Sequence, residues 1–343
     1  MVDNGDEKDA QQPNEVDTDD ISTTQANNTT GAPTAKLTQE TSHTNKVDHS
    51  SPETSETATK TDEKKQKHLT LTIFGIIAAV LVVVIVAVVG YGYWDKQHAE
   101  ERAYQQLQGL TQKPEGMNKQ GGLPAFKASD FNPKAPSVDL YVDYFCPDCA
   151  DLDHDTAPTL KKLAEARQIN LYLHPVNFLD AKTKNHYSTR AAGVAAYISS
   201  HEPDKLLDFT SSMYDTDFHH QSLDGKNVTD QQIIDQALKA GVSKQVASAA
   251  TNGSYTDYVQ RATKYTLLRK DLFVDVRGEH RFSSPTITIN GTMWKYRAMQ
   301  KLENVSSALI QVIGLNERDV GNPQVTPSIG AHGQVGAIAK QYL

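Results

Sequence analysis

The pattern of hydrophobic and polar residues changes sharply after the first 68 residues. The run LTLTIFGIIAAVLVVVIVAVV over residues 69–89 carries no charge, whereas the residues before it include no Phe, Trp or Tyr. A helix of that length crosses a hydrocarbon core of about 30 Å. Tyr91, Tyr93 and Trp94 follow, as is typical of one membrane face. The pattern predicts one transmembrane helix over residues 69–94.

Three polar segments flank or follow this run. Residues 1–68 lack the apolar residues that a core needs, so we expect a disordered tail. Residues 95–120 are rich first in Ala, Gln and Glu and then in Gly, which predicts a stalk or linker. Residues 316–343 contain several Gly and Pro and are expected to form a flexible C-terminal tail. The folding sequence is therefore expected within residues 121–315.

Residues 121–315 have the patterns of a mixed α/β domain. The stretches SVDLYVDYF and INLYLHPVNFL alternate hydrophobic and polar residues and predict two core strands, parallel because a helical segment joins them. From about residue 187 to 273 the pattern is helical, which predicts a helical insert. SPTITING and TMWKY then predict a hairpin with a tight Asn-Gly turn, followed by a closing helix. This order predicts a compact α/β fold.

Charge is distributed unevenly between the tail and the domain. Residues 1–68 contain 14 acidic and 7 basic residues, while the whole chain has a net charge of −8. The remainder is nearly neutral, which argues against nucleic-acid binding because that requires a basic stripe. Four lysines over residues 60–67 precede the apolar run. The positive-inside rule therefore predicts a single-pass protein of the cell membrane, with its tail in the cytoplasm and its domain outside.

A cleaved signal peptide is the alternative interpretation of the apolar run. Such a peptide has a short charged leader and an apolar core of 7–15 residues. The run over residues 69–89 is longer than that, and 68 residues precede it. These proportions favour an uncleaved signal anchor.

The chain contains only two cysteines, Cys146 and Cys149, and both lie on the predicted outer side. An oxidising compartment suits disulfide chemistry. Two cysteines at the start of a helix can close a small ring, because residues three apart are neighbours there. Unpaired amides and the helix dipole favour a thiolate at Cys146, the predicted nucleophile, and Cys149 is the predicted resolving thiol. Pro147 suits the first helical turn.

Other polar side chains near the pair leave alternatives open. Asp143, in the strand before the pair, is either a buried proton acceptor for Cys149 or an exposed carboxylate. His154 and nearby aspartates could join the cysteines on zinc, but zinc sites favour four well-spaced ligands, so we expect no metal and no cofactor. His154 is expected to be exposed on a helix. The pair His219 and His220 is expected to be solvated in a polar loop.

The string FCPDC after a strand, then a helical insertion, then SSPTITING, resembles the DsbA-like branch of the thioredoxin fold in its membrane-anchored bacterial form. The resemblance covers roughly residues 121–314. It implies a thioredoxin fold with an inserted helical domain that forms a lid. It also implies a cis bond between Ser284 and Pro285 facing the cysteines, with Thr286 next to it, and an aromatic cover over the disulfide from Phe145.

Asp148 is a departure from the family pattern. Strong oxidants of the family resemble Cys-Pro-His-Cys, whereas this chain has Cys-Pro-Asp-Cys. A carboxylate near Cys146 opposes its thiolate. Because a destabilised thiolate weakens the reduced form, we expect a less oxidising couple than in those members.

Together these features predict a thiol–disulfide oxidoreductase outside the membrane that forms disulfides in cysteine-containing exported proteins. The resemblance implies reoxidation by a quinone-linked membrane partner, and the anchor would hold both proteins in one plane. Two alternatives remain. One is a reductase or isomerase fed from the membrane, because direction depends on the potentials of the pair and of its partner. The other is a non-redox, chaperone-like binding module.

Overall fold

The computed structural model describes residues 59–224, 227–299 and 304–335. Its first helix, α1, spans Thr59–Gln97, and the part Leu71–Gln97 is long and apolar enough to cross a membrane. The large apolar side chains of this part are exposed, which suits lipid rather than water. Most of the tail expected over residues 1–68 lies outside the described residues. Its last ten residues differ from that expectation, because they form the start of α1.

A five-stranded sheet with the order β1-β3-β2-β6-β7 forms the centre of the domain. Strands β2 and β3 are parallel, as predicted, because helix α3 connects them. Strand β6 pairs antiparallel with β2, and β7 extends the sheet by the predicted hairpin. The strands are β1 (Leu123–Pro124), β2 (Ser137–Val142), β3 (Asn170–Pro175), β6 (Thr286–Ile289) and β7 (Thr292–Trp294). The central position of β2 explains why Val138, Leu140 and Tyr141 are all buried.

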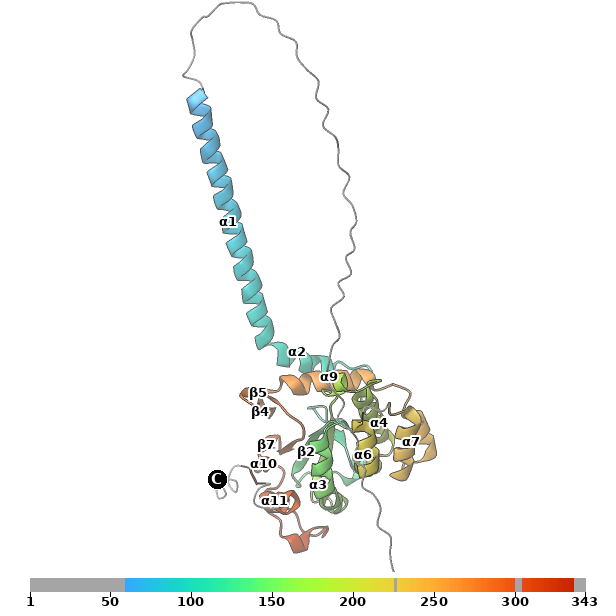
Figure 1. Cartoon of the computed structure of the whole chain (residues 1–343). Helices are drawn as coiled ribbons and strands as arrows, with labels where there is room; N and C mark the ends of the chain where they lie inside the picture. Colours follow the sequence, from blue (N-terminus) through green and yellow to red (C-terminus); the bar gives the residue numbers. More distant parts are fainter. Residues whose placement is uncertain (1–58, 225–226, 300–303, 336–343) are drawn as a thin grey trace, which may run out of the picture. The chain divides into compact units, whose positions relative to one another are not determined.

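Helices cover this sheet and confirm the thioredoxin fold with inserted helices. The insert predicted over residues 187–273 consists of α4 to α9, and α7 begins with a capping box between Thr229 and Gln232. In Figure 1, α4, α6 and α7 gather on one side of β2 and α3, and α10 and α11 lie on the other. The helices are α2 (Ala99–Gln108), α3 (Pro147–Glu165), α4 (Tyr187–His201), α5 (Leu206–Met213), α6 (Thr216–Leu223), α7 (Asp230–Lys239), α8 (Lys244–Ala249), α9 (Thr256–Leu268), α10 (Tyr296–Met299) and α11 (Val305–Val312).

Both ends of the domain extend beyond the limits expected from the sequence. Helix α2 lies in the predicted stalk, yet Ala103 and Leu107 are buried and the helix packs against α9. At the other end, the predicted loose tail is held over residues 316–335. The side-chain amide of Gln168 donates to three backbone carbonyls there, at 2.8, 3.0 and 3.1 Å. The C-terminal segment has no hydrophobic period, because single polar side chains hold it. Helix α2 has only two buried residues, Ala103 and Leu107, which is too short a pattern to distinguish it from a stalk.

The hairpin turn Asn290-Gly291 takes positive φ angles at both residues, as predicted for a tight turn. The Asn290 side chain also links distant segments. Its Oδ1 accepts the Ser137 amide at 2.9 Å, and its Nδ2 donates to the carbonyls of Gly330 and Gly333, each at 2.9 Å. One side chain thereby fixes the start of β2, the turn and part of the C-terminal segment.

Two features of the domain differ from the predicted elements. A two-stranded hairpin, β4 (Phe273–Val276) and β5 (Glu279–Phe282), follows the insert and was not predicted. Most of its side chains are at least partly exposed, so it lacks the hydrophobic alternation of a core strand. The closing helix is divided into α10 and α11, and residues 300–303 between them lie outside the described residues.

Candidate active site

The two cysteines lie just after β2, at the start of α3. Cys146 is the N-cap residue, with extended backbone angles, and Pro147 takes the first helical position. The missing N–H of Pro147 costs nothing there, because first-turn amides have no partner within the helix. Both cysteines are free thiols, and 6% of Cys146 and 1% of Cys149 are exposed. The sequence therefore predicted their placement correctly, with Cys149 the more buried of the two.

The two thiols differ in acidity because their surroundings differ. The hydrogen bond from the Cys149 thiol lowers the pKa of Cys146 to about 7, helped by Ser284 and against the effect of burial. The Asp148 carboxylate also opposes this shift by raising the pKa of Cys146. Burial raises the pKa of Cys149 well above its usual value. Cys146 is therefore the thiol that ionises near neutral pH and can attack a disulfide.

A loop before β6 closes the site on the other side. The peptide bond between Ser284 and Pro285 is cis, as the family resemblance implied. The antiparallel pairing of Tyr141 with Thr286 brings this loop to the end of β2. There the Cys146 thiol donates to the Ser284 carbonyl oxygen, with Sγ and O 3.7 Å apart. The hydroxyl of Thr286 donates to the Ser283 carbonyl at 2.6 Å and fixes the start of β6.

Asp143 is fully buried, so the alternative of an exposed carboxylate is wrong. Its Oδ1 accepts the Ser188 hydroxyl at 2.6 Å and the Phe145 amide at 3.0 Å, and its Oδ2 accepts the Leu179 amide at 3.0 Å. Burial raises the pKa of Asp143 to about 6, although these donors favour the charged form. The contact with Cys149 is a hydrogen bond from the Asp143 backbone. Phe145, the predicted aromatic cover, is half-buried beside the pair and packs against the core.

Sequence reasoning missed Arg297 and Tyr296, which approach the cysteines from α10. Arg297 Nη2 lies 3.3 Å from Asp148 Oδ2 and donates to the Ser284 carbonyl at 3.1 Å. The Tyr296 hydroxyl donates to the Pro285 carbonyl at 3.3 Å. These residues lie about 150 positions beyond the cysteines in a short helix, so neither spacing nor periodicity indicated the contact.

The histidines are placed only partly as expected. His154 is exposed on α3, with its Nε2 2.7 Å from the Tyr214 carbonyl. The prediction of a solvated pair was wrong for His219, which is buried in α6 and has its pKa lowered to about 4 by burial. Its neighbour His220 is exposed. Within the described residues, no cluster of three or more His, Cys, Asp or Glu side chains is arranged to hold a metal ion.

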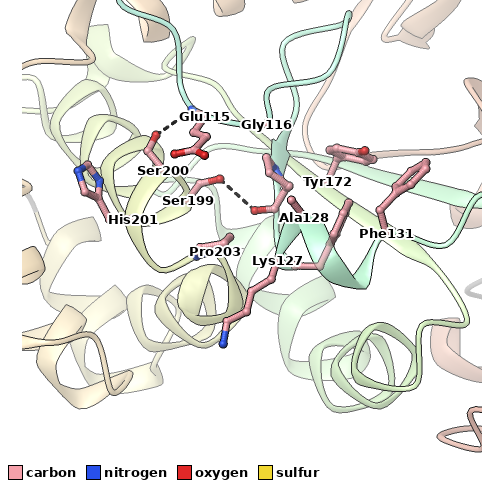
Figure 2. A pocket seen from close by; sticks show the side chains of 12 residues that line it. Glu115, Gly116, Lys127, Ala128, Phe131, Tyr172, Ser199, Ser200, His201 and Pro203 are labelled. Atoms are coloured by element: carbon pink, nitrogen blue, oxygen red, sulfur yellow. Dashed lines mark hydrogen bonds between the residues drawn. The ribbon is translucent and has the colours of Figure 1, made fainter.

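Among the hollows on the described part of the domain, one borders the residues next to the cysteines. A cleft of about 880 Å³ runs between the β4–β5 hairpin and the start of α10, and Asp148, Pro285 and Arg297 form part of its wall. The pocket in Figure 2, of about 510 Å³, lies beside β1 and the end of α4. Phe131 and Tyr172 line it, and no residue of the Cys-Pro-Asp-Cys motif or of the cis-proline loop does. Of these two hollows, only the first borders the Cys-Pro-Asp-Cys motif and the cis-proline loop.

Comparisons with known proteins agree with this arrangement. A family model described as thioredoxin matches residues 132–310. The serine/threonine-protein kinase PknE of Mycobacterium tuberculosis is 24% identical over 120 residues, which cover 34% of this chain and 21% of the kinase. The chain thus matches about a fifth of the length of this curated relative.

This chain is also similar to two solved structures. The reduced disulfide bond oxidoreductase DsbG from Mycobacterium tuberculosis has a TM-score of 0.46 at 18% identity, over 65% of this chain and 99% of that protein. The thiol-disulfide oxidoreductase MdbA from Actinomyces oris also has a TM-score of 0.46, at 19% identity, over 61% of this chain and 95% of that protein. The family match covers more than half of the sequence and includes both cysteines and the cis-proline loop, so this chain belongs to the thioredoxin family.

Proposed function

We propose that this protein is a membrane-anchored thiol–disulfide oxidoreductase that forms disulfides in exported proteins. The observation that carries the proposal is the asymmetry of the cysteine pair. Cys146 ionises near pH 7 at the N-terminus of α3, beside the cis-proline loop, while Cys149 is kept protonated behind it. A pair with one nucleophilic and one protected thiol is suited to ordered disulfide exchange.

In the oxidising direction, the Cys146–Cys149 disulfide is the reactant. A substrate thiolate attacks Cys146 Sγ, the bond between Cys146 and Cys149 breaks, and Cys149 leaves as a thiolate that takes up a proton. A second substrate thiolate then attacks the substrate sulfur of the mixed disulfide, and Cys146 leaves as a thiolate. The substrate gains one disulfide by losing two electrons, and the enzyme is left as the dithiol.

The cis-proline loop is the proposed place where the substrate backbone lies. Pro285 has no N–H, and an extended peptide that pairs with the adjacent backbone would present its cysteine to Cys146. The cleft of about 880 Å³ beside Pro285 provides room for the flanking side chains. Exported polypeptides with free cysteines are the substrates that such a backbone contact can accept with little dependence on sequence.

Asp143 is the proposed proton acceptor of the resolving step of reoxidation, in which the Cys149 thiol loses its proton and attacks the mixed disulfide between Cys146 and the oxidant. Its backbone already contacts the Cys149 thiol, and its carboxyl group is buried with a pKa raised to about 6. Such a carboxylate is charged at neutral pH but accepts a proton more readily than an exposed one. Phe145 is the proposed cover of the disulfide, since it is half-buried beside the pair.

The proposed location is the cell membrane, with α1 as the anchor, the lysine-flanked tail in the cytoplasm and the domain outside. A quinone-linked membrane protein is the proposed oxidant of the reduced pair. The anchor confines both proteins to one plane, which raises their effective concentration.

The reduction potential of the full-length chain tests the direction. The protein in detergent micelles is equilibrated with glutathione mixtures, and the fraction of Cys146–Cys149 disulfide is measured. We expect a value of about −120 to −180 mV, in the range of disulfide donors. A value of about −270 mV, the range of thioredoxin, would contradict the oxidase assignment.

Asp148 favours one alternative function, because it raises the pKa of Cys146 and so disfavours a strong oxidant. A reductase or isomerase would have the low potential just given and would need a membrane electron donor. A chaperone-like binding module is the other alternative. A Cys146→Ala variant separates it from both redox functions, since a binding module would keep its cellular role without the thiol.

A further inference from the structure

Arg297 connects the two halves of the redox site. Its Nη2 atom donates to the Ser284 carbonyl at 3.1 Å and lies 3.3 Å from Asp148 Oδ2. The same guanidinium lies against the Tyr296 ring, with its carbon 5.9 Å from the ring centroid. Tyr296 in turn donates to the Pro285 carbonyl at 3.3 Å. Two successive carbonyls of the cis-proline loop are thus held from α10.

The Ser284 carbonyl oxygen accepts two hydrogen bonds, and one of these hydrogen bonds is lost during the reaction. The first is the Cys146 thiol, at 3.7 Å, and the second is Arg297, at 3.1 Å. When Cys146 ionises, its S–H no longer donates, and the partial negative charge of the oxygen then faces a negative sulfur. The hydrogen bond from Arg297 remains and brings a full positive charge to that side, which offsets the repulsion.

The contact between Arg297 and Asp148 acts on the carboxylate that disfavours the Cys146 thiolate. Asp148 raises the pKa of Cys146. The pKa of Arg297 is raised, against the effect of burial, by Tyr296 and then by the charges of Asp148 and Cys146. The side chains of Arg297 and Asp148 are 42% and 68% exposed, so water screens this ion pair. The Ser284 carbonyl is buried and less screened. Most of the effect of Arg297 should therefore pass through the carbonyl.

We propose that Arg297 is a positioning residue of the redox site, whose guanidinium holds the Ser284 carbonyl and offsets the Asp148 carboxylate so that Cys146 can carry negative charge between them. The inference rests on the proposed redox function and deepens it. Arg297 supplies a positive charge beside the Cys-Pro-Asp-Cys motif, in which Asp148 carries a negative charge.

The test uses the reduced full-length chain in detergent micelles. The rate at which iodoacetamide alkylates Cys146 is followed from pH 4 to 9 by mass spectrometry, and the midpoint of the rise gives the pKa. We expect Arg297→Met to raise the midpoint, with alkylation at pH 7 slower by roughly three- to tenfold. Arg297→Lys should restore part of this loss, because it keeps the positive charge but lacks the planar guanidinium. Lys295→Met, which removes a positive charge from the same cleft, is the matched control and should leave the midpoint in place.

A second comparison separates the two contacts. In an Asp148→Asn background, Arg297→Met should still raise the midpoint, because the contact with Ser284 remains to be lost. Equal midpoints for the wild-type protein and Arg297→Met overturn the proposal, as does an equal shift in Lys295→Met. If Arg297→Met does not fold, Arg297→Gln decides, because it removes the positive charge but keeps a donor; an unchanged midpoint and alkylation rate there overturn the proposal. Absence of any exchange between the wild-type protein and glutathione instead overturns the proposed function itself.

Discussion

Replacing Asp148 by His tests the electrostatics of the cysteine pair directly. Asp148 is the second residue of α3, its side chain is 68% exposed, and it lies 3.3 Å from Arg297. Because water screens an exposed charge, its effect on the Cys146 thiolate is about 0.5–1 kcal/mol. One pKa unit corresponds to about 1.4 kcal/mol. The change also leaves Arg297 without this acidic partner, so we expect the pKa of Cys146, now about 7, to fall by roughly half to one unit.

A lower pKa means more thiolate at pH 7 and therefore a more stable reduced form. For a two-electron couple this shift corresponds to a rise of roughly 10–20 mV in the reduction potential. Alkylation of Cys146 as a function of pH measures the pKa, and equilibration with glutathione measures the potential. Asp151→His, the same charge change one turn later on an exposed position, is the control and should have a smaller effect. A pKa in Asp148→His equal to or above that of the wild-type protein would refute the reasoning.

Three further substitutions test other parts of the structure. Asp143→Asn should lower stability by about 1–3 kcal/mol and slow the resolving step, because the new N–H₂ faces backbone donors. The raised pKa of Asp143 stabilises the protonated state, so the wild-type protein gains stability as pH falls through about 6 and the gain is complete below about 4. Melting curves of both proteins across this range should diverge, and parallel curves would contradict the assignment. Leu107→Ala should cost about 2–5 kcal/mol if α2 belongs to the core, and Gln105→Ala should be neutral in the same melting assay. Gln168→Ala should expose residues 316–335 to limited proteolysis, whereas the wild-type pattern would show that this amide does not hold them.

The sequence predicted those parts of the site that depend on local rules. A C-x-x-C pair after a core strand and a proline at the first helical position determine where both cysteines lie, because strand and helix periodicity are read directly from the residues. The cis bond before Pro285 came from the family resemblance instead. No composition or spacing rule distinguishes it from an ordinary Ser-Pro bond.

The remaining parts depend on contacts between distant residues. Arg297 reaches Asp148 across 149 positions, and the short helix that carries it has no strong pattern. The sequence does not decide between a buried and an exposed Asp143, because a strand pattern assigns a face but not the depth of burial. Helix α4 buries the carboxylate and contacts it through Ser188. The β4–β5 hairpin escaped prediction because its exposed strands do not alternate.

The side-chain amide of Asn290 lies at a position where the protein can change chemically as it ages. Asn-Gly sequences are prone to deamidation, since glycine leaves the preceding side chain free to react with the backbone. Conversion to aspartate would replace the Nδ2 donor by an oxygen that faces the carbonyl oxygens of Gly330 and Gly333, both 2.9 Å away. Repulsion between oxygen atoms would then replace both hydrogen bonds. In aged protein the C-terminal segment should therefore detach from the turn first. The turn itself should keep its shape, because aspartate tolerates the positive φ angle at this position.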